Sequence, residues 1–464
     1  MPSIPESVAA GRLLPENLRD ISPEINRQHF YERQTRLHYF ALADCNNFFV
    51  SCERLFRPDL SNRPVLVLSN NDGCVISRSN EVKALGIKMG VPLFQIKHLV
   101  RQYNIAVFSS NFPLYLDLSA RVASVLNDSA PALERYSIDE AFMDLTGMQK
   151  NYNIFDYCMD IRWRVTHDVG IPICVGAGAT KTLAKIANHC AKKGMTLGGV
   201  MTIDNDDERI YALKQTPLDD IWGIGRALEQ KFRERYGVRT AYDLSLLDPE
   251  IIKKQFNITA ANVIYELNGI SCIPFEDMPR PKKQIMWSRT FGHHILSLGE
   301  LSQAVSEFTA RAAEKLREDQ LFTAIVSVFI QTNRASTVDQ QYARQAYIRL
   351  PCPLNDTPGL IQAANTVLEK IFVSGYRYYK AGVIFEDLRV TSTYQCGLFD
   401  DNILTEEARQ KRQRIQAAVD KLNQKKRNTV FMASQGIYAR QNVSAQHNVS
   451  PGYTTSWKDV PKVK

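Results

Sequence analysis

The sequence predicts a multidomain α+β protein, and three observations lead to that fold class: length, composition and the order of apolar segments. The chain has 464 residues, 44% hydrophobic and 23% charged, which is globular composition with enough chain for about three domains. From 38 to 205, with 61–111 treated as an insert, the apolar patterns run β-α-β-β-α-β. That order is typical of the ferredoxin-like arrangement, in which helices cover one face of an antiparallel sheet.

Charge and cysteine usage narrow the class of protein further. The net charge of +8 fits a polyanionic partner, but many ordinary proteins are as basic. The nine cysteines include no C-x-x-C pair, so neither a disulfide framework nor a zinc site is expected. No apolar run is long enough to span a bilayer and no signal-peptide core follows the start. We therefore expect a soluble, cytoplasmic protein.

The first expected strand and the expected middle hairpin hold the candidate catalytic acids. "HYFALAD" opens at His38 as a nearly continuous apolar run, typical of a strand buried on both faces, and ends at Asp44. "YSIDEAFMDL" (136–145) has the pattern of a strand pair around a short break that holds Asp139 and Glu140. The next elements are expected as two strands around an Asn-Asp-Gly turn (63–79), a helix in 80–92 that Gly86 closes, helices at 114–127, 152–167 and 180–193, and a strand and turn at 171–179. Beyond them we expect mostly helix over 206–275, helices at 301–317 and 359–373, and strands at 322–332 and 380–388.

These acids predict a metal site. In the ferredoxin-like order the strand that ends at Asp44 lies beside the hairpin of Asp139 and Glu140, so three carboxylates converge on one edge of the sheet. Three such charges need compensation, which Mg²⁺ can supply with its preference for carboxylate and phosphate oxygens. Two such ions would clamp the attacking and leaving oxygens of a phosphoryl transfer. The alternative is that the Asp-Glu pair is a solvated hairpin tip.

Four segments then resemble a known family. "ADCNNFFVSCE" (43–53), "VISRSNEVKALGIKMG" (75–90), "YSIDEAFMDL" and "GAGATKTLAKIANHCAKK" (176–193) are similar to the signatures of Y-family translesion DNA polymerases, and "VLVLSNNDGCVISRS" (65–79) resembles the UmuC branch. The resemblance covers about 38–464. It implies a right-hand polymerase with a ferredoxin-like palm, small fingers, a helical thumb and an α+β little finger. The implied activity is error-prone translesion DNA synthesis in SOS-type damage tolerance.

The resemblance also implies a division of the chain into domains. The expected parts are a flexible N-terminal extension (1–37), the palm (38–60 and 112–205), the fingers (61–111), a helix-hairpin-helix thumb (206–276), a linker (277–284), the little finger (285–392) and a C-terminal partner-binding tail (393–464).

Within the implied active centre, Asp44, Asp139 and Glu140 match the catalytic, metal-binding acids, and the backbone carbonyl of Cys45 would face one of two Mg²⁺ ions. Phe49 matches the steric gate that excludes a ribose 2′-OH. In an extended segment Phe48 and Phe49 point opposite ways, so one of them should face the site and Phe48 is expected in the core. The alternative is that Phe49 is simply a core residue. The side chains implied to bind the nucleotide are Ser77, Arg78, Lys83 and Lys185.

Two further features of 176–193 have competing interpretations. Lys181 precedes Lys185 by four residues, so both lie on one face near a helix start that favours phosphate, and Lys181 is either a second phosphate ligand or a solvated lysine. "GAGATKT" resembles a P-loop, but Thr180 stands where glycine is required before the lysine, so an NTPase is rejected.

DNA and protein partners are implied by the later segments. "WGIGR" (222–226) resembles the hairpin of a helix-hairpin-helix, in which Gly223 and Gly225 would let backbone N–H groups approach a phosphate, although an ordinary glycine turn is the alternative. Further DNA contacts are expected from Arg280, Lys282, Lys283 and Arg289 around the linker.

The tail resembles a recruitment segment. "QCGLFD" (395–400) is similar to sliding-clamp peptides through Gln395, Leu398 and Phe399. The basic stretch 405–428 carries a helical apolar stripe of Ile415, Val419 and Leu422, which would contact DNA or protein or be a solvated helix. The family implies a UmuD′-like dimer, RecA and the clamp as partners, besides primer-template DNA and dNTP, with no membrane. Two other functions compete: a non-catalytic DNA-bound repair scaffold and a nucleotidyl cyclase.

Overall fold

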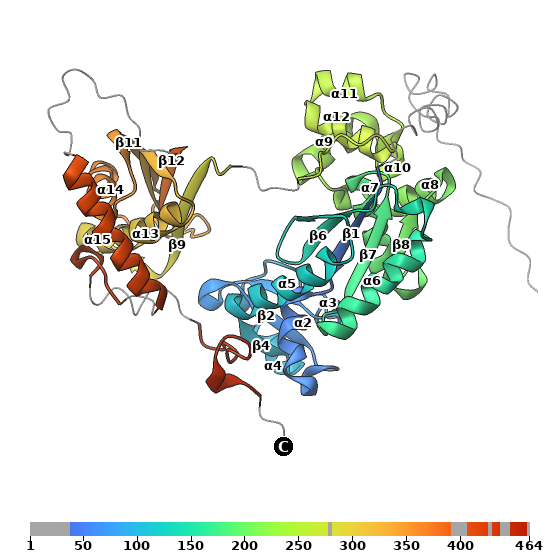
Figure 1. Ribbon diagram of the computed structural model, residues 1–464, viewed down its shortest axis with the longest axis horizontal. Coiled ribbons are helices and arrows are strands. Elements are labelled where there is room, and N and C mark those ends of the chain that lie inside the picture. Colours follow the sequence, from blue (N-terminus) through green and yellow to red (C-terminus); the bar gives the residue numbers. More distant parts are fainter. Residues whose placement is uncertain (1–37, 277–280, 391–405, 426–428, 437–445, 462–464) are drawn as a thin grey trace, which may run out of the picture. The chain divides into compact units, whose positions relative to one another are not determined.

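The computed structural model describes residues 38–276, 281–390, 406–425, 429–436 and 446–461 (Figure 1). Contacts divide the chain into two compact units: one holds most residues up to 279 and those from 448 on, and the other holds 70–72 and 280–447. In the described ranges, no helix has the length and apolar character needed to cross a membrane. The predictions for 1–37, Arg280 and the clamp peptide lie outside the described residues.

The first unit is built on a five-stranded sheet with helices on both faces. The expectation of helices on one face holds for α5 and α6, whose apolar side chains join Ala41 and Ala43 in one core. Phe40 and Leu42 point the other way and contact Ala184 of α7, because neighbouring strand residues face opposite sides. The strands, in sheet order, are β5 (Ala132–Arg135), β6 (Glu140–Asp144), β1 (Phe40–Cys45), β7 (Ile173–Gly178) and β8 (Val200–Ile203), and the helices are α5 (Phe112–Asn127), α6 (Ile154–Asp168) and α7 (Lys181–Lys192).

The first four strands have the predicted ferredoxin-like order, and every neighbouring pair among them is antiparallel. The strand β8 pairs parallel to β7, with α7 as the crossover between them. A parallel pair needs such a crossover, and this one places α7 on the face opposite α5 and α6. The βαβ addition therefore buries β1 and β7 on both faces, as the apolar run at His38 predicted.

A glycine sets how closely α7 lies on the sheet. A Cβ added at Gly176 would stand 2.0 Å from the backbone nitrogen of Asn188 and 2.4 Å from the carbonyl oxygen of Ala184. The hydroxyl of Thr180 caps α7 by accepting a hydrogen bond from the Leu183 N–H. The "GAGATKT" segment is thus a strand and a helix cap, which agrees with the rejection of a P-loop.

The insert in this unit forms a small sheet of its own. The predicted hairpin is present, because β2 and β3 pair antiparallel, and β4 adds a parallel strand that the sequence did not predict. The elements are α2 (Phe48–Leu55), β2 (Val65–Leu68), β3 (Val75–Arg78), α3 (Asn80–Ala84), α4 (Leu93–Gln102) and β4 (Ala106–Ser109).

A helical part follows the sheet and packs in the same unit against α7. Its helices are α8 (Asp206–Gln215), α9 (Arg226–Tyr236), α10 (Ala241–Ser245), α11 (Pro249–Gln255) and α12 (Ile258–Leu267).

The second unit is an antiparallel sheet covered by two helices, α13 and α14, which share its core. The sequence predicted β10, β12 and both helices but not the outer strands β9 and β11. In sheet order the strands are β11 (Ala343–Leu354), β10 (Phe322–Thr332), β12 (Tyr378–Arg389) and β9 (Gln284–Ile295), and the helices are α13 (Leu298–Glu318) and α14 (Thr357–Ile371).

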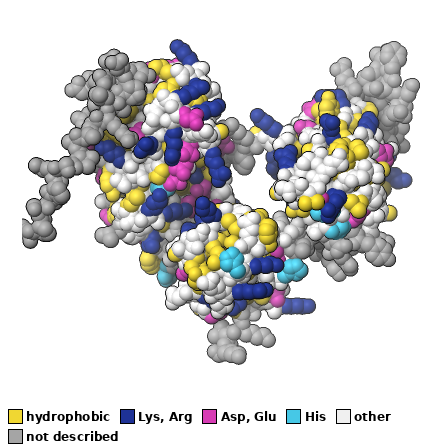
Figure 2. Space-filling model, turned by 180° about the vertical axis from the view of Figure 1, so that it is seen from behind, with side chains coloured by type: hydrophobic (Ala, Val, Ile, Leu, Met, Phe, Trp, Pro, Cys, Tyr) yellow, Lys and Arg dark blue, Asp and Glu magenta, His cyan; other side chains and the backbone are white. Residues whose placement is uncertain are grey.

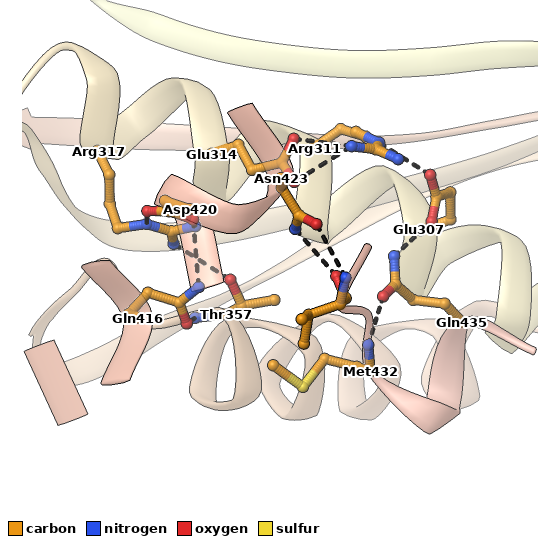
Figure 3. A network of polar contacts seen from close by, with 11 residues as sticks. Glu307, Arg311, Glu314, Arg317, Thr357, Gln416, Asp420, Asn423, Met432 and Gln435 are labelled. Atoms are coloured by element: carbon orange, nitrogen blue, oxygen red, sulfur yellow. Dashed lines mark hydrogen bonds and ion pairs between the residues drawn. The ribbon is translucent and has the colours of Figure 1, made fainter. Parts of the chain in front are cut away.

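A later helix, α15 (Glu406–Lys425), docks on this unit through polar side chains (Figure 3). Arg317 forms an ion pair with Asp420 at 2.6 Å, and Gln416 is buried and accepts a hydrogen bond from the Thr357 N–H. Ile415 and Leu422 of the predicted apolar stripe are exposed. The helix is thus not a free solvated one, and its docking face is polar because it meets the charged side of α13.

Candidate active site

The fold brings the three predicted acids to one edge of the sheet. Asp44, near the end of β1, stands directly opposite Glu140, the first residue of β6. Asp139, in the turn before β6, lies beside Cys45, because the Cys45 N–H donates to the carbonyl oxygen of Asp139 at 2.9 Å. The predicted juxtaposition of residues 44, 139 and 140 is therefore present.

Two lysines of α7 face two of these acids. Asp44 lies two residues after Leu42 in the same strand, so both side chains point to the face covered by α7. There Asp44 forms an ion pair with Lys192 at 2.5 Å. Glu140 forms an ion pair with Lys185 at 2.9 Å. The site is therefore a cluster of alternating charges between two strands and one helix.

Burial makes the first acid unusual. It raises the pKa of the Asp44 carboxyl to about 7, the neighbouring Lys192 opposes the rise, and Glu140 adds to it. A carboxyl poised near neutral pH, with charged partners, is typical of functional sites. Burial also raises the pKa of the Cys45 thiol well above its usual range, so this side chain stays neutral.

The nearest positive charges to these acids in the structure come from α7. Among the described residues no three His, Cys, Asp or Glu side chains are gathered as a metal-binding group. The ammonium groups of Lys192 and Lys185 lie against Asp44 and Glu140, and two Mg²⁺ ions at these acids stay a prediction. Lys192 was not among the predicted site residues, although it follows Lys185 by seven residues, which is two helical turns on the same face.

The predicted gate residue lies in a helix, so the expectation of an extended segment at Phe48 and Phe49 is wrong. Phe48 is only 3% exposed and belongs to the core. Phe49 is half-buried, and its ring stacks on Tyr115 at 4.7 Å and meets Phe112 edge-on at 5.8 Å. The expectation that Phe48 is core is confirmed, and Phe49 is less buried because helical neighbours differ by about 100°.

The other predicted nucleotide ligands lie in the insert. Ser77 is buried and stands opposite Val67 in the β2–β3 pair, and Arg78 donates to the carbonyl oxygen of Ile87. The pKa of the Lys83 ammonium is lowered, first by burial and then by the charges of Arg78 and Lys192. Lys83 therefore belongs electrostatically to the cluster of charges at the sheet edge.

Lys181 is neither solvated nor available to a phosphate. Its side chain is buried, pairs with Glu134 and donates to the carbonyl oxygen of Pro274 at 2.7 Å. The ammonium also lies 5.1 Å from the Phe142 ring centre and 5.4 Å from that of Phe275. Both sequence interpretations of Lys181 were therefore wrong, and its role in the described structure is to hold the sheet against the chain after α12.

The "WGIGR" turn lies beside the acidic hairpin. Gly223 has a φ of +93°, a conformation that favours glycine, and Gly225 is the N-cap of α9. Trp222 donates through Nε1 to the hydroxyl of Tyr136 at 3.1 Å. The Lys185 ammonium lies 4.6 Å from the Tyr136 ring centre and 5.3 Å from that of Trp222.

The predicted DNA-binding cations begin the second unit. Lys282 forms an ion pair with Asp319 at 2.5 Å, Lys283 is exposed, and the Arg289 guanidinium lies 5.0 Å from the Trp287 ring centre. On the face shown in Figure 2, Lys and Arg side chains are spread over both units rather than gathered into one patch.

A comparison with solved structures defines the class of fold. The chain matches a Y-family DNA polymerase chimera, Dbh-Dpo4(243-245)-Dbh, with a TM-score of 0.60 and 18% identity, over 76% of this chain and 100% of that one. The fold is therefore that of a multidomain Y-family DNA polymerase.

Sequence comparisons identify the family. The impB/mucB/samB family model matches residues 43–189, its C-terminal domain model matches 282–398, and a domain of unknown function matches 413–463. The chain is 40% identical to protein SamB and 40% identical to protein UmuC, both of Salmonella typhimurium, over 92% of its length and 99% and 100% of theirs. DNA polymerase IV of Dehalococcoides mccartyi is 28% identical over 82% of this chain and 93% of that protein.

The chain belongs to the impB/mucB/samB family and is a UmuC-like Y-family protein. It is a translesion DNA-directed DNA polymerase.

Proposed function

We propose that the polymerising centre is the sheet edge of Asp44, Asp139 and Glu140, where the primer 3′-OH attacks the α-phosphate of a dNTP and pyrophosphate leaves. The observation that carries this proposal is the cross-strand pairing of Asp44 with Glu140, with Asp139 one register step away. These acids come from distant parts of the sequence and share an edge with two lysines, which is the charge pattern that a triphosphate and its cations require.

The donor set fits Mg²⁺. Hard carboxylate oxygens and the Cys45 carbonyl suit this ion. Burial raises the pKa of the Asp44 carboxyl to about 7, and a bound cation would stabilise its ionised form. When bound, two Mg²⁺ ions would lower the pKa of the attacking hydroxyl and screen the charge of the triphosphate. Lys185 and Lys192 then exchange their carboxylate partners for phosphate oxygens, with Lys83 as a third cation. The Phe49 ring excludes the ribose 2′-OH.

DNA is held without reading its sequence. The backbone N–H groups around Gly223 and Gly225 donate hydrogen bonds to a phosphate, and Lys282, Lys283 and Arg289 add salt-sensitive affinity. The sheet face of the second unit that lacks helices presents Tyr347 and Arg349, both exposed, to the template.

Partners enter through the later segments. Gln395, Leu398 and Phe399 are the proposed sliding-clamp peptide, and a UmuD′-like dimer and RecA are the further partners in SOS-type, error-prone synthesis. Exposed Ile415 and Leu422 on α15, flanked by basic residues, are available to such a partner because the helix docks through its other face.

Primer extension tests this function. The purified chain with Mg²⁺ and dNTPs is expected to extend a primer on undamaged DNA and to insert opposite an abasic site, with or without added partners, whereas Asp139→Ala should extend neither. Normal extension by that variant would overturn the assignment of the acids. If the parent chain bound DNA but never extended it, even with all three partners, the non-catalytic scaffold would be the better description.

A further inference from the structure

The segment from residue 448 on packs on the first unit, although it is distant in sequence from the residues that it contacts there (Figure 1). At the end of β4, the Ser109 N–H donates to the Asn448 carbonyl at 2.9 Å and the Asn448 N–H donates to the Ser109 hydroxyl at 2.9 Å. Five residues later the Tyr453 ring stacks on Phe56 at 4.6 Å. The segment is therefore anchored at two points.

Between these anchors Ser450 enters the interior. Its side chain is buried, and the Asn111 amide donates to its carbonyl oxygen at 3.1 Å and to its hydroxyl at 3.0 Å. The Ser450 hydroxyl in turn donates to the Oε1 atom of Glu53 at 3.1 Å. A residue 397 positions away in sequence is thus a direct partner of a carboxyl on α2.

That carboxyl is linked to the proposed gate. Glu53 is fully buried, and its Oε1 atom also accepts a hydrogen bond from the Tyr115 hydroxyl at 2.6 Å. The Tyr115 ring, itself fully buried, stacks on Phe49 at 4.7 Å with an interplanar angle of 21°. Ser450, Glu53, Tyr115 and Phe49 therefore form one continuous chain of contacts.

The chain of contacts depends on its hydroxyl donors. Burial raises the pKa of the Glu53 carboxyl, and the hydroxyls of Tyr115 and Ser450 oppose that rise. Within the described residues the second oxygen, Oε2, has no hydrogen-bond partner. A buried carboxyl is unfavourable unless it is hydrogen-bonded, and a satisfied one fixes the orientation of its partners. An apolar core would hold Tyr115 in place without specifying where its hydroxyl points.

We propose that Ser450 is a positioning residue for sugar selection, which acts through Glu53 and Tyr115 on the ring of Phe49. This inference rests on the proposed role of Phe49 as the gate. It assigns to the final folded segment, which lies within the match to a domain of unknown function at 413–463, a part in choosing deoxyribonucleotides over ribonucleotides.

The test is the ratio of kcat/KM for a dNTP to that for its rNTP, measured with the full chain on a primer-template. Ser450→Ala should lower this ratio about three- to tenfold, the effect of one buried hydrogen bond, mainly by raising rNTP incorporation. Ser450→Thr retains the hydroxyl and should restore the ratio. Thr455→Ala removes the hydroxyl of an exposed residue in the same segment and should leave the ratio unchanged.

A second variant separates positioning from folding. Tyr115→Phe keeps the stacked ring but loses the bond to Glu53, so it should lower the ratio as Ser450→Ala does. The double variant should show less than the sum of the two effects, because both remove support from the same atom. Thermal unfolding of each variant checks that the catalytic unit is intact.

Different outcomes would overturn the role of Ser450 and the role of Phe49 as the steric gate. If Phe49→Ala leaves the ratio unchanged, the gate role fails. If Phe49→Ala lowers the ratio while Ser450→Ala and Tyr115→Phe behave like the parent, or lower incorporation of both nucleotides equally, the positioning role of Ser450 is overturned and the segment only supports the fold.

Discussion

Replacing Asp44 by Asn should stabilise the protein at the expense of its activity, and the gain should depend on pH. Its folded-state pKa of about 7 lies above the ordinary value of 3.8. As pH rises from about 4 to about 7, the unfolded carboxyl loses its proton while the folded one retains it, so the folded state loses stability over that window. Asn cannot ionise and avoids this loss.

The magnitude follows from the size of the pKa change. A rise from 3.8 to about 7 corresponds to an upper limit of about 4 kcal/mol at pH 8. Because Lys192 is partly exposed and solvent screens this charge cluster, we expect about half of that, or roughly 4–8 °C in the unfolding temperature of a unit of this size. At pH 4 the difference should nearly vanish.

The assay is thermal unfolding of Asp44→Asn and the parent chain at pH 4, 6 and 8, with a chelator present so that no divalent ion binds the acids. Asp59→Asn is the matched control, since the exposed Asp59 pairs with Arg57, which lowers the pKa of its carboxyl, and its loss should not stabilise the protein at any of these pH values. A gain of equal size at pH 4 and pH 8, or no gain at pH 8, would refute the reasoning about burial.

Four other substitutions have defined outcomes. Gly176→Ala places a Cβ against the α7 backbone and should lower the free energy of unfolding by about 3 kcal/mol or more in an unfolding titration. A Cβ at Gly225 would have no atom within 4 Å, so Gly225→Ala should leave stability intact and weaken DNA affinity in a binding titration. Equal stabilities of the two variants would contradict the close packing of α7 at Gly176. Phe49→Ala should raise rNTP incorporation in primer extension, and unchanged selectivity would remove its gate role. Asp420→Ala breaks the partly buried ion pair with Arg317 and should weaken the docking of α15 by about 1–3 kcal/mol. A protease should then cut 406–425 faster than in the parent chain. An unchanged cleavage rate would mean that other contacts hold the helix.

The sequence predicted the site where the apolar pattern and the topology agree. The run that ends at Asp44 and the break at Asp139 could be placed side by side because the ferredoxin-like order leaves few alternatives. The pattern at Phe48 was ambiguous, since apolar residues at 48, 50 and 52 alternate as in a strand, whereas Phe48 and Cys52 also have the i, i+4 spacing of a helix.

Other features had weak or no sequence signals. The outer strands β9 and β11 were missed because edge strands carry polar residues on their open face. The docking of α15 uses Gln416 and Asp420 rather than its apolar stripe, which reverses the usual rule for helix packing. No periodicity links Ser450 to Glu53, so only a folded structure could bring them together.

The most direct test of the catalytic assignment is single-nucleotide incorporation by Glu140→Gln under saturating Mg²⁺ and dNTP. The substitution keeps the size of the side chain and removes the charge that faces Lys185 and Asp44. We predict a rate lower by about a thousandfold or more, with the Kd for primer-template DNA within about twofold of the parent value. Incorporation at the parental rate would contradict the placement of the polymerising centre at this sheet edge.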